Sequence, residues 1–157
     1  MQRIGSHSKG INILGKIHVN ATNITISDNV NIYPGVYFWG DGEIIIGDNV
    51  DIGVGTIIFS KTRVVVGNNT VIAGQCYIID SNHSVKKNKL IRDQQQITNK
   101  TDVVIGEDVW IAAGCKIILG AKIGNGAVIG AMSMVNSEID NYSIAVGIPA
   151  KVIKYRN

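Results

Sequence analysis

An aliphatic residue stands at every sixth position from residue 105 to residue 135 of this chain. The positions are Ile105, Ile111, Ile117, Ile123, Ile129 and Val135. An amphipathic helix buries a stripe at a period of about 3.6 residues and a half-buried strand alternates at about 2, so neither explains this spacing. The fifth residue of each hexad is small, at Val109, Cys115, Ala121, Ala127 and Ser133. We expect each hexad to form a short strand and a turn, with its first and fifth side chains facing inward.

The same spacing occurs upstream, in blocks that begin 20 residues apart. The large apolar positions are Ile26, Ile32, Phe38 and Ile44, then Ile46, Ile52, Ile58 and Val64, then Val66, Ile72 and Ile78. Twenty residues are three hexads plus two, and the extra residues fall near the polar stretches GDGE at 40–43 and SKTR at 60–63. Three hexads therefore predict one triangular coil, and the coils stack with one widened corner.

The length and composition favour a single folded domain over residues 1–157, with 45% hydrophobic residues. We expect a degenerate N-terminal coil over 1–25, since terminal repeats cap a solenoid, and a C-terminal tail over 141–157. The net charge of +3 comes without a basic run, which does not indicate nucleic-acid binding. No segment approaches the roughly 18 apolar residues of a membrane span, and no signal peptide is recognised, so the cytoplasm is the expected location.

The repeat breaks once, between Ile78 and Ile105, over 27 residues. A polar segment at 83–101 has almost no inward candidates, and we expect it to protrude from the column as a loop. A solvated surface insertion is the simplest interpretation, but long polar loops on rigid scaffolds are often functional. His83 lies where this loop begins, and it is one of three histidines in the chain.

The segment D-S-N-H at 80–83, the VWI-containing hexads and the ending AVGIPAKVIK resemble the hexapeptide-repeat acyltransferases, in particular the maltose, galactoside and xenobiotic O-acetyltransferase branch. This resemblance implies an all-β fold, a left-handed parallel β-helix with one protruding loop. It also implies that His83 is the general base. Asp80 either orients the imidazole or forms a turn, and both interpretations remain open.

The resemblance further implies that acetyl-CoA is the co-substrate and that the active sites lie between the subunits of a homotrimer. Asn82 and Trp110 would line the acceptor side of the site. The Thr-Lys pair of many relatives is replaced here by Asn136 and Ser137. The positions that match coenzyme A contacts are Ala112, Ala113, Ala131, Met132, Asn136, Ser137, Lys151 and Lys154.

The expected reaction is O-acetylation of a sugar or polysaccharide precursor, in which a neutral histidine accepts the proton of a hydroxyl that attacks the thioester. A cysteine nucleophile is disfavoured, because Cys76 and Cys115 fall at inward fifth positions. N-acetylation of an amino sugar and O-acetylation of an antibiotic are the alternatives. No metal is expected, since a zinc enzyme of the γ-carbonic anhydrase type needs three grouped histidines. A non-catalytic scaffold is the more distant possibility.

Overall fold

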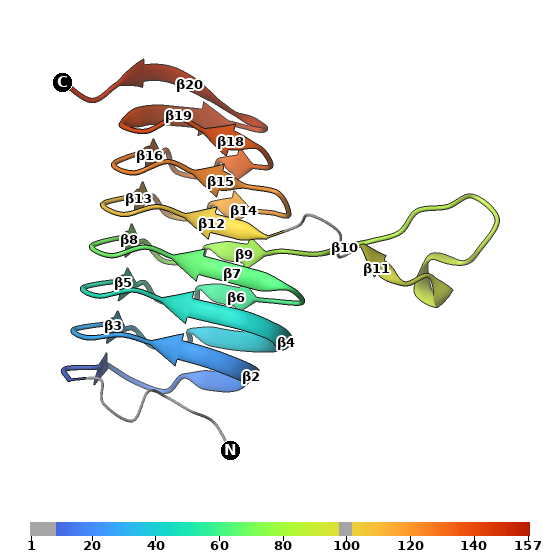
Figure 1. Cartoon of the computed structure of the whole chain (residues 1–157), viewed down its shortest axis with the longest axis horizontal. Coiled ribbons are helices and arrows are strands. Elements are labelled where there is room, and N and C mark those ends of the chain that lie inside the picture. Colours follow the sequence, from blue (N-terminus) through green and yellow to red (C-terminus); the bar gives the residue numbers. More distant parts are fainter. Residues whose placement is uncertain (1–8, 98–101) are drawn as a thin grey trace.

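The computed structural model describes residues 9–97 and 102–157, and it is an all-β left-handed parallel β-helix, as expected. The coils stack into a column whose N-terminal end lies at the bottom of Figure 1 and whose C-terminal end lies at the top. One arm leaves the column at mid-height. In the described ranges, the strands of successive coils fall on three flat walls, which we call walls A, B and C.

Wall A is a continuous parallel sheet in which each strand pairs in register with the strand of the next coil. Its strands are β1 (Asn12–Ile13), β3 (Asn31–Ile32), β5 (Asp51–Ile52), β8 (Val71–Ile72), β13 (Trp110–Ile111), β16 (Val128–Ile129) and β19 (Ser143–Gly147). The pairing β8–β13 aligns Ile72 with Ile111, which closes the column across the whole arm insertion.

Walls B and C share one sheet because β4 (Tyr37–Ile46) continues around the corner between them. In the coil below, β2 (His18–Ile26) pairs with β4 and turns the same corner. Wall B continues upward through β6 (Ile57–Phe59), β9 (Tyr77–Ile79), β14 (Lys116–Ile117) and β17 (Met134–Val135). Wall C continues through β7 (Arg63–Val66), β12 (Val103–Ile105), β15 (Lys122–Ile123) and β18 (Glu138–Ile139).

The hexad positions fill the interior of the column, which confirms the inward register predicted from the sequence. Each first-position residue from Ile105 to Val135 is at most 3% exposed, and each fifth-position residue is at most 1% exposed. Burial of such an aliphatic side chain contributes about 1.5–3 kcal/mol, so a regular stack of them makes the column one continuous core.

Polar fifth positions are satisfied by the coil above. Thr56 Oγ1 donates to the Ala73 carbonyl at 3.1 Å, and Cys76 Sγ donates to the Ala112 carbonyl at 3.3 Å. A small hydrogen-bond donor therefore fits at these positions, because the corner of the next coil presents a backbone carbonyl directly above it.

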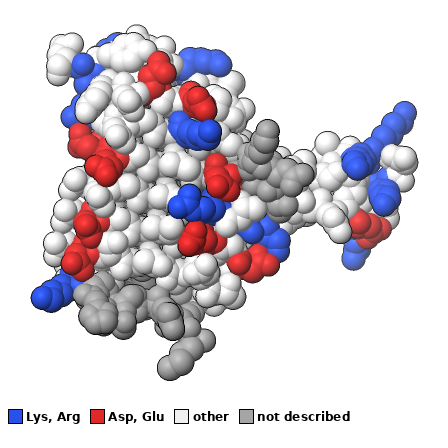
Figure 2. Space-filling model, viewed as in Figure 1, with Lys and Arg blue, Asp and Glu red and all other residues white. Residues whose placement is uncertain are grey.

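The corner between walls B and C is widened at 40–43 and 60–63, as the 20-residue spacing predicts. Gly40 has φ +116°, and a Cβ there would collide with the backbone of Ser60. Across this corner Lys61 pairs with Asp41 at 2.7 Å, and this hydrogen bond lowers the pKa of the Asp41 carboxyl. Figure 2 shows such acidic and basic side chains interleaved on the column, while basic ones gather on the arm.

The two ends of the column differ in structure. The described part of the degenerate N-terminal segment forms a coil from β1 and β2, in which Ile13 and Leu14 stay 50% exposed. Residues 1–8 lie outside the described residues. At the other end, the expected tail contributes β19 to wall A, and β20 (Ala150–Tyr155) folds back antiparallel to it. Arg156 anchors this end through Asp108 at 3.0 Å.

Candidate active site

The arm begins after β9, a strand of wall B, and the chain returns to the column at β12 on wall C (Figure 1). Its stem is a two-stranded antiparallel pair, β10 (Asn82–His83) with β11 (Gln96–Ile97). This pairing places His83 opposite Gln96. A protruding segment starting at residue 83 was predicted, and residues 98–101 of that segment lie outside the described residues. The histidine is thus fixed to the column by the short stem.

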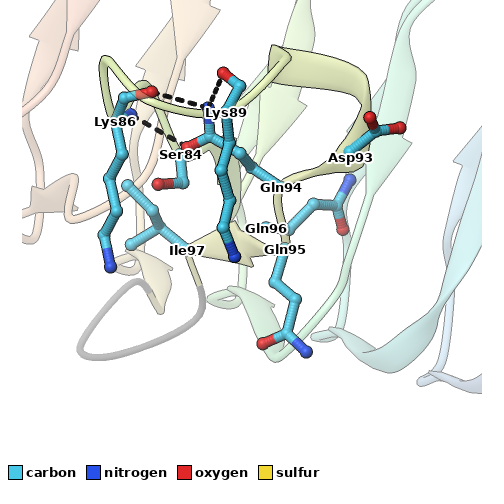
Figure 3. Close-up of a pocket in the computed structure, with 8 residues that line it drawn as sticks. All are labelled: Ser84, Lys86, Lys89, Asp93, Gln94, Gln95, Gln96 and Ile97. Atoms are coloured by element: carbon cyan, nitrogen blue, oxygen red, sulfur yellow. Dashed lines mark hydrogen bonds between the residues drawn. The ribbon is translucent and has the colours of Figure 1, made fainter.

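The distal part of the arm is held by one glutamine. Gln94 Oε1 accepts from the Lys86 amide at 2.8 Å, and its Nε2 donates to the carbonyls of Lys86 and Lys89 at 3.0 and 2.9 Å. Figure 3 shows this side chain between the two lysines, next to the η1 turn (Ile91–Asp93). A cavity of about 540 Å³ lies here, but it is open and lined by flexible polar side chains. In the described part of this segment, which has no paired strands beyond the stem, the Gln94 side chain makes the hydrogen bonds to the backbone that hold the two sides of the arm together.

Asp80 is fully buried at the foot of the arm, and its hydrogen bonds go to the widened corner of the coil below. It accepts from Ser60 Oγ at 2.8 Å, from the Lys61 amide at 2.7 Å, and from the Thr62 amide and hydroxyl at 2.9 and 3.1 Å. None of these bonds involves His83. In this structure the carboxylate joins the foot of the arm to the coil below, and no hydrogen bond from it to the imidazole is present among the described residues.

His83 is exposed and lies at the root of the arm, on β10. Its backbone amide donates to Asn82 Oδ1 at 2.9 Å. Among the described residues, no hydrogen bond or ion pair engages the imidazole. A general base needs a free ring nitrogen, and His83 has one among the described residues.

A pocket of about 340 Å³ adjoins His83 at the corner of walls B and C. Besides Asn82 and His83, it is lined by Trp39, Phe59, Tyr77, Ile79, Ser81 and Gln96. Trp39, Phe59 and Ile79 stack in register across β4, β6 and β9. The sequence analysis missed these residues, although their spacing of 20 was a signal that could have found them.

The positions expected to contact coenzyme A lie at separate places on the chain. Ala112 and Ala113 stack below Ala131 and Met132 at the corner of walls A and B, where the Met132 amide donates to the Ala113 carbonyl at 2.9 Å. Met132 is 70% exposed. The other four positions are also exposed. Asn136 and Ser137 lie at the upper corner of walls B and C, and Lys151 and Lys154 lie on β20.

Trp110 faces outward on wall A with 52% of its surface exposed, as its register predicts. It lines a shallow pocket of about 440 Å³ with Val71, Val128 and Arg156. His83 does not belong to that pocket. Within one chain, the structure therefore does not bring the tryptophan and the histidine together.

Both cysteines are buried thiols of the core, as predicted. Cys115 Sγ donates to the Gly130 carbonyl at 3.1 Å. The hydrogen bond with Cys115, together with burial, raises the pKa of the Cys76 thiol. The hydrogen bond with Cys76 lowers the pKa of the Cys115 thiol to about 7. Both thiols are nevertheless buried in the core, so neither has the access to substrate that a nucleophile needs.

The described residues hold no group of three or more His, Cys, Asp or Glu side chains arranged to bind a metal ion. In the same residues, no helical segment has the length and apolar character to cross a bilayer.

Comparison with known proteins agrees with the repeat. Residues 102–137 match the family described as bacterial transferase hexapeptide (six repeats). The probable acetyltransferase Rv3034c of Mycobacterium tuberculosis is 40% identical over 87 residues, which are 55% of this chain and 28% of that protein. The putative lipopolysaccharide biosynthesis O-acetyl transferase WbbJ of Escherichia coli is 34% identical over 94 residues, 56% of this chain and 48% of that protein. The chain thus spans less than half the length of either relative.

Among solved structures, a mutant of AntD, an N-acyltransferase from Bacillus cereus, superposes with a TM-score of 0.82 at 26% identity. The match covers 99% of this chain and 86% of that chain. That crystal contains dTDP-4-amino-4,6-dideoxyglucose and coenzyme A.

Proposed function

We propose that this hexapeptide-repeat protein is an acetyl-CoA-dependent O-acetyltransferase that acts on a hydroxyl of a sugar or polysaccharide precursor. The observation that carries the proposal is His83, an exposed imidazole without a hydrogen-bond partner among the described residues, beside a pocket at the root of the arm. The hexapeptide match and the acetyltransferase relatives support the reaction class.

The proposed chemistry is direct transfer. The imidazole of His83 accepts the proton of the acceptor hydroxyl as its oxygen attacks the thioester carbonyl carbon. A tetrahedral intermediate forms, and a backbone N–H is the natural donor to its oxyanion. The carbon–sulfur bond then breaks, the thiolate of coenzyme A leaves, and the imidazolium returns the proton to that sulfur. The burial of Cys76 and Cys115 supports a path without a covalent intermediate.

The coenzyme A site is proposed to run along the wall B side of the column. Exposed small residues at Ala113 and Ala131 leave room for the pantetheine chain to lie flat against the corner. Lys151 and Lys154 on β20 are exposed cations suited to the phosphates. Because these positions lie on different walls, we propose that a second copy of the chain completes the groove.

N-acylation of an amino sugar is the second candidate. The observation that favours N-acylation is the amino-sugar ligand in the crystal of AntD, a protein whose sequence is 26% identical to this chain. An amine attacks the same carbonyl and must also lose a proton, so His83 would serve either acceptor.

The test is release of the coenzyme A thiol from acetyl-CoA in the presence of hydroxyl and amino sugars, for the wild type and a His83→Ala variant. We expect kcat/KM to fall at least a hundredfold in the variant, because general-base catalysis contributes about 10²–10⁴-fold. His18→Ala is the matched control, since His18 stacks on Tyr37 at 5.1 Å and does not line the pocket. Full turnover in His83→Ala would remove this residue from the mechanism.

A further inference from the structure

The pocket beside His83 contains a buried hydroxyl without a partner. Ser81 lines it and is 3% exposed, and its Oγ makes no hydrogen bond among the described residues. Nearly all buried polar groups in folded proteins are paired, because an unpaired one has lost its hydrogen bonds to water. A side chain in this state on the wall of a cavity is open to a partner from the cavity, either a water or a bound molecule.

The opposite side of the pocket offers an aromatic face. Trp39 is 51% exposed, yet its position is fixed by an edge contact with Phe59, whose ring centroid lies 5.0 Å away at an interplanar angle of 78°. An indole combines a large apolar face with a polar N–H, so it is suited to binding a partly polar ligand. A rigid exposed ring beside scattered polar groups suits a ligand with one apolar face and polar edges, as a pyranose has.

The charge of the pocket narrows the ligand further. Among its described lining residues, none is an Asp, Glu, Lys or Arg. The polar groups are the Ser81 hydroxyl, the amides of Asn82 and Gln96, the Tyr77 phenol and the His83 imidazole. These groups hydrogen-bond to neutral hydroxyls, and apart from the imidazole, which the proposed mechanism uses in its neutral form, they provide no countercharge for a carboxylate or a phosphate.

We infer that this pocket is the acceptor subsite and that it takes a neutral pyranose ring. The apolar face of the sugar stacks on Trp39, one ring hydroxyl bonds to Ser81, and the hydroxyl or amine to be acylated points toward His83. Trp39 and Ser81 are thus specificity-determining residues for the reaction. The statement that a hydroxyl or amine of the sugar reacts beside His83 rests on the proposed acyl transfer. The statement that the pocket binds the sugar ring does not depend on it.

Binding is tested without catalysis. In a Trp110→Phe protein, Trp39 is the remaining tryptophan, because the chain has two. Its fluorescence is titrated with methyl glycosides of glucose, galactose and N-acetylglucosamine, with dTDP-glucose, and with glucuronic acid. We expect saturable changes with neutral rings and a glucuronic acid affinity at least tenfold weaker. If the methyl glycosides saturate the signal, the sugar ring alone is sufficient for binding. If only dTDP-glucose saturates it, the pocket binds the same ring when it is linked to a nucleotide.

Steady-state kinetics test the two side chains. Trp39→Leu should raise the acceptor KM at least tenfold and Ser81→Ala about tenfold, with the KM for acetyl-CoA and kcat nearly unchanged, because both remove uniform binding. Trp39→Phe should recover part of the loss. Tyr33→Leu is the matched control, an exposed aromatic of wall A in the same coil. Circular dichroism melting confirms that each variant folds.

Unchanged acceptor KM in both Trp39→Leu and Ser81→Ala overturns the subsite, and so does equal binding of glucuronic acid and neutral rings. A different result separates the two proposals. If neutral sugars perturb Trp39 but no acceptor releases thiol from acetyl-CoA, the binding site stands and the proposed transferase activity fails.

Discussion

Asp80 lies beside the candidate active site, and all its observed hydrogen bonds are structural. Its carboxylate is fully buried, and it collects two backbone amides and two hydroxyls from residues 60–62. Successive amides converging on one anion form a concave donor site, so the charge is compensated without a cation. Asp80 thereby fixes the foot of the arm from which His83 projects.

Replacing Asp80 with Asn tests this role. One carboxylate oxygen becomes an NH₂ donor facing other donors, so we expect the free energy of unfolding to fall by about 2–4 kcal/mol. Chemical denaturation measures this change. The matched control is Asp41→Asn at the same corner one coil below, where an exposed ion pair with Lys61 is lost and no measurable change in melting temperature is expected. Equal effects of both substitutions would contradict the structural role.

At the scale of elements, the arm and the column rest on different interactions. Each coil strand pairs with neighbours above and below and buries its inward residues. The arm beyond its stem buries no side chain in the described residues, and Gln94 closes it. Segments with few buried contacts open locally at low free energy, so the arm should open independently of the column.

Gln94→Ala should therefore loosen the arm and leave the column intact. We expect tryptic cleavage at Lys86, Lys89 or Arg92 to accelerate at least fivefold, while the melting temperature of the column stays within about 2 °C. Gel electrophoresis and mass spectrometry of the fragments measure the rates. Gln95→Ala, an exposed neighbour, is the control and should cleave at the wild-type rate. An unchanged rate in Gln94→Ala would show that other contacts hold the arm.

At the scale of the whole molecule, the residues proposed for the active site do not all meet within one chain. His83 and Trp110 line different pockets. The arm also exposes apolar side chains, with Val85 at 77%, Leu90 at 68% and Ile91 at 57%. Exposed apolar groups at the tip of a protrusion are typical of contact with another subunit. Symmetric assembly would cover them in every copy at once.

Light scattering tests the homotrimer that the resemblance to the hexapeptide-repeat acyltransferases implies. We expect a mass of three chains for the wild type and a single chain mass for a variant carrying Leu90→Asp and Ile91→Asp, because buried charges without partners destabilise an interface. Lys89→Asp is the matched control on the same arm and should keep the larger mass. A wild-type protein that is monomeric at micromolar concentration would rule out active sites shared between subunits.

Much of the candidate site could be located in the sequence but not assembled from it. The break in the period placed His83 at the root of a protrusion, and the hexad register placed Trp110 outside and the cysteines inside. The sequence left the role of Asp80 open between two interpretations, because a carboxylate three residues from a histidine says nothing about which donors reach it. The spacing of 20 could have placed Trp39 above or below Phe59, but nothing in the sequence marks Ser81 as their neighbour, because it stands where the repeat breaks.

The repeat by itself determined the stacked triangular coils, the inward residues and the widened corners, because a solenoid carries the same short-range geometry in every coil and the period records it directly. The left hand of the coil was implied only by the family resemblance. The tertiary structure alone decided which side chains meet. Trp39 and Ser81 lie 42 positions apart in the chain and line one pocket. Their proximity depends on the stacking of the coils and on the point where the arm leaves the wall, so it is set by contacts between distant segments.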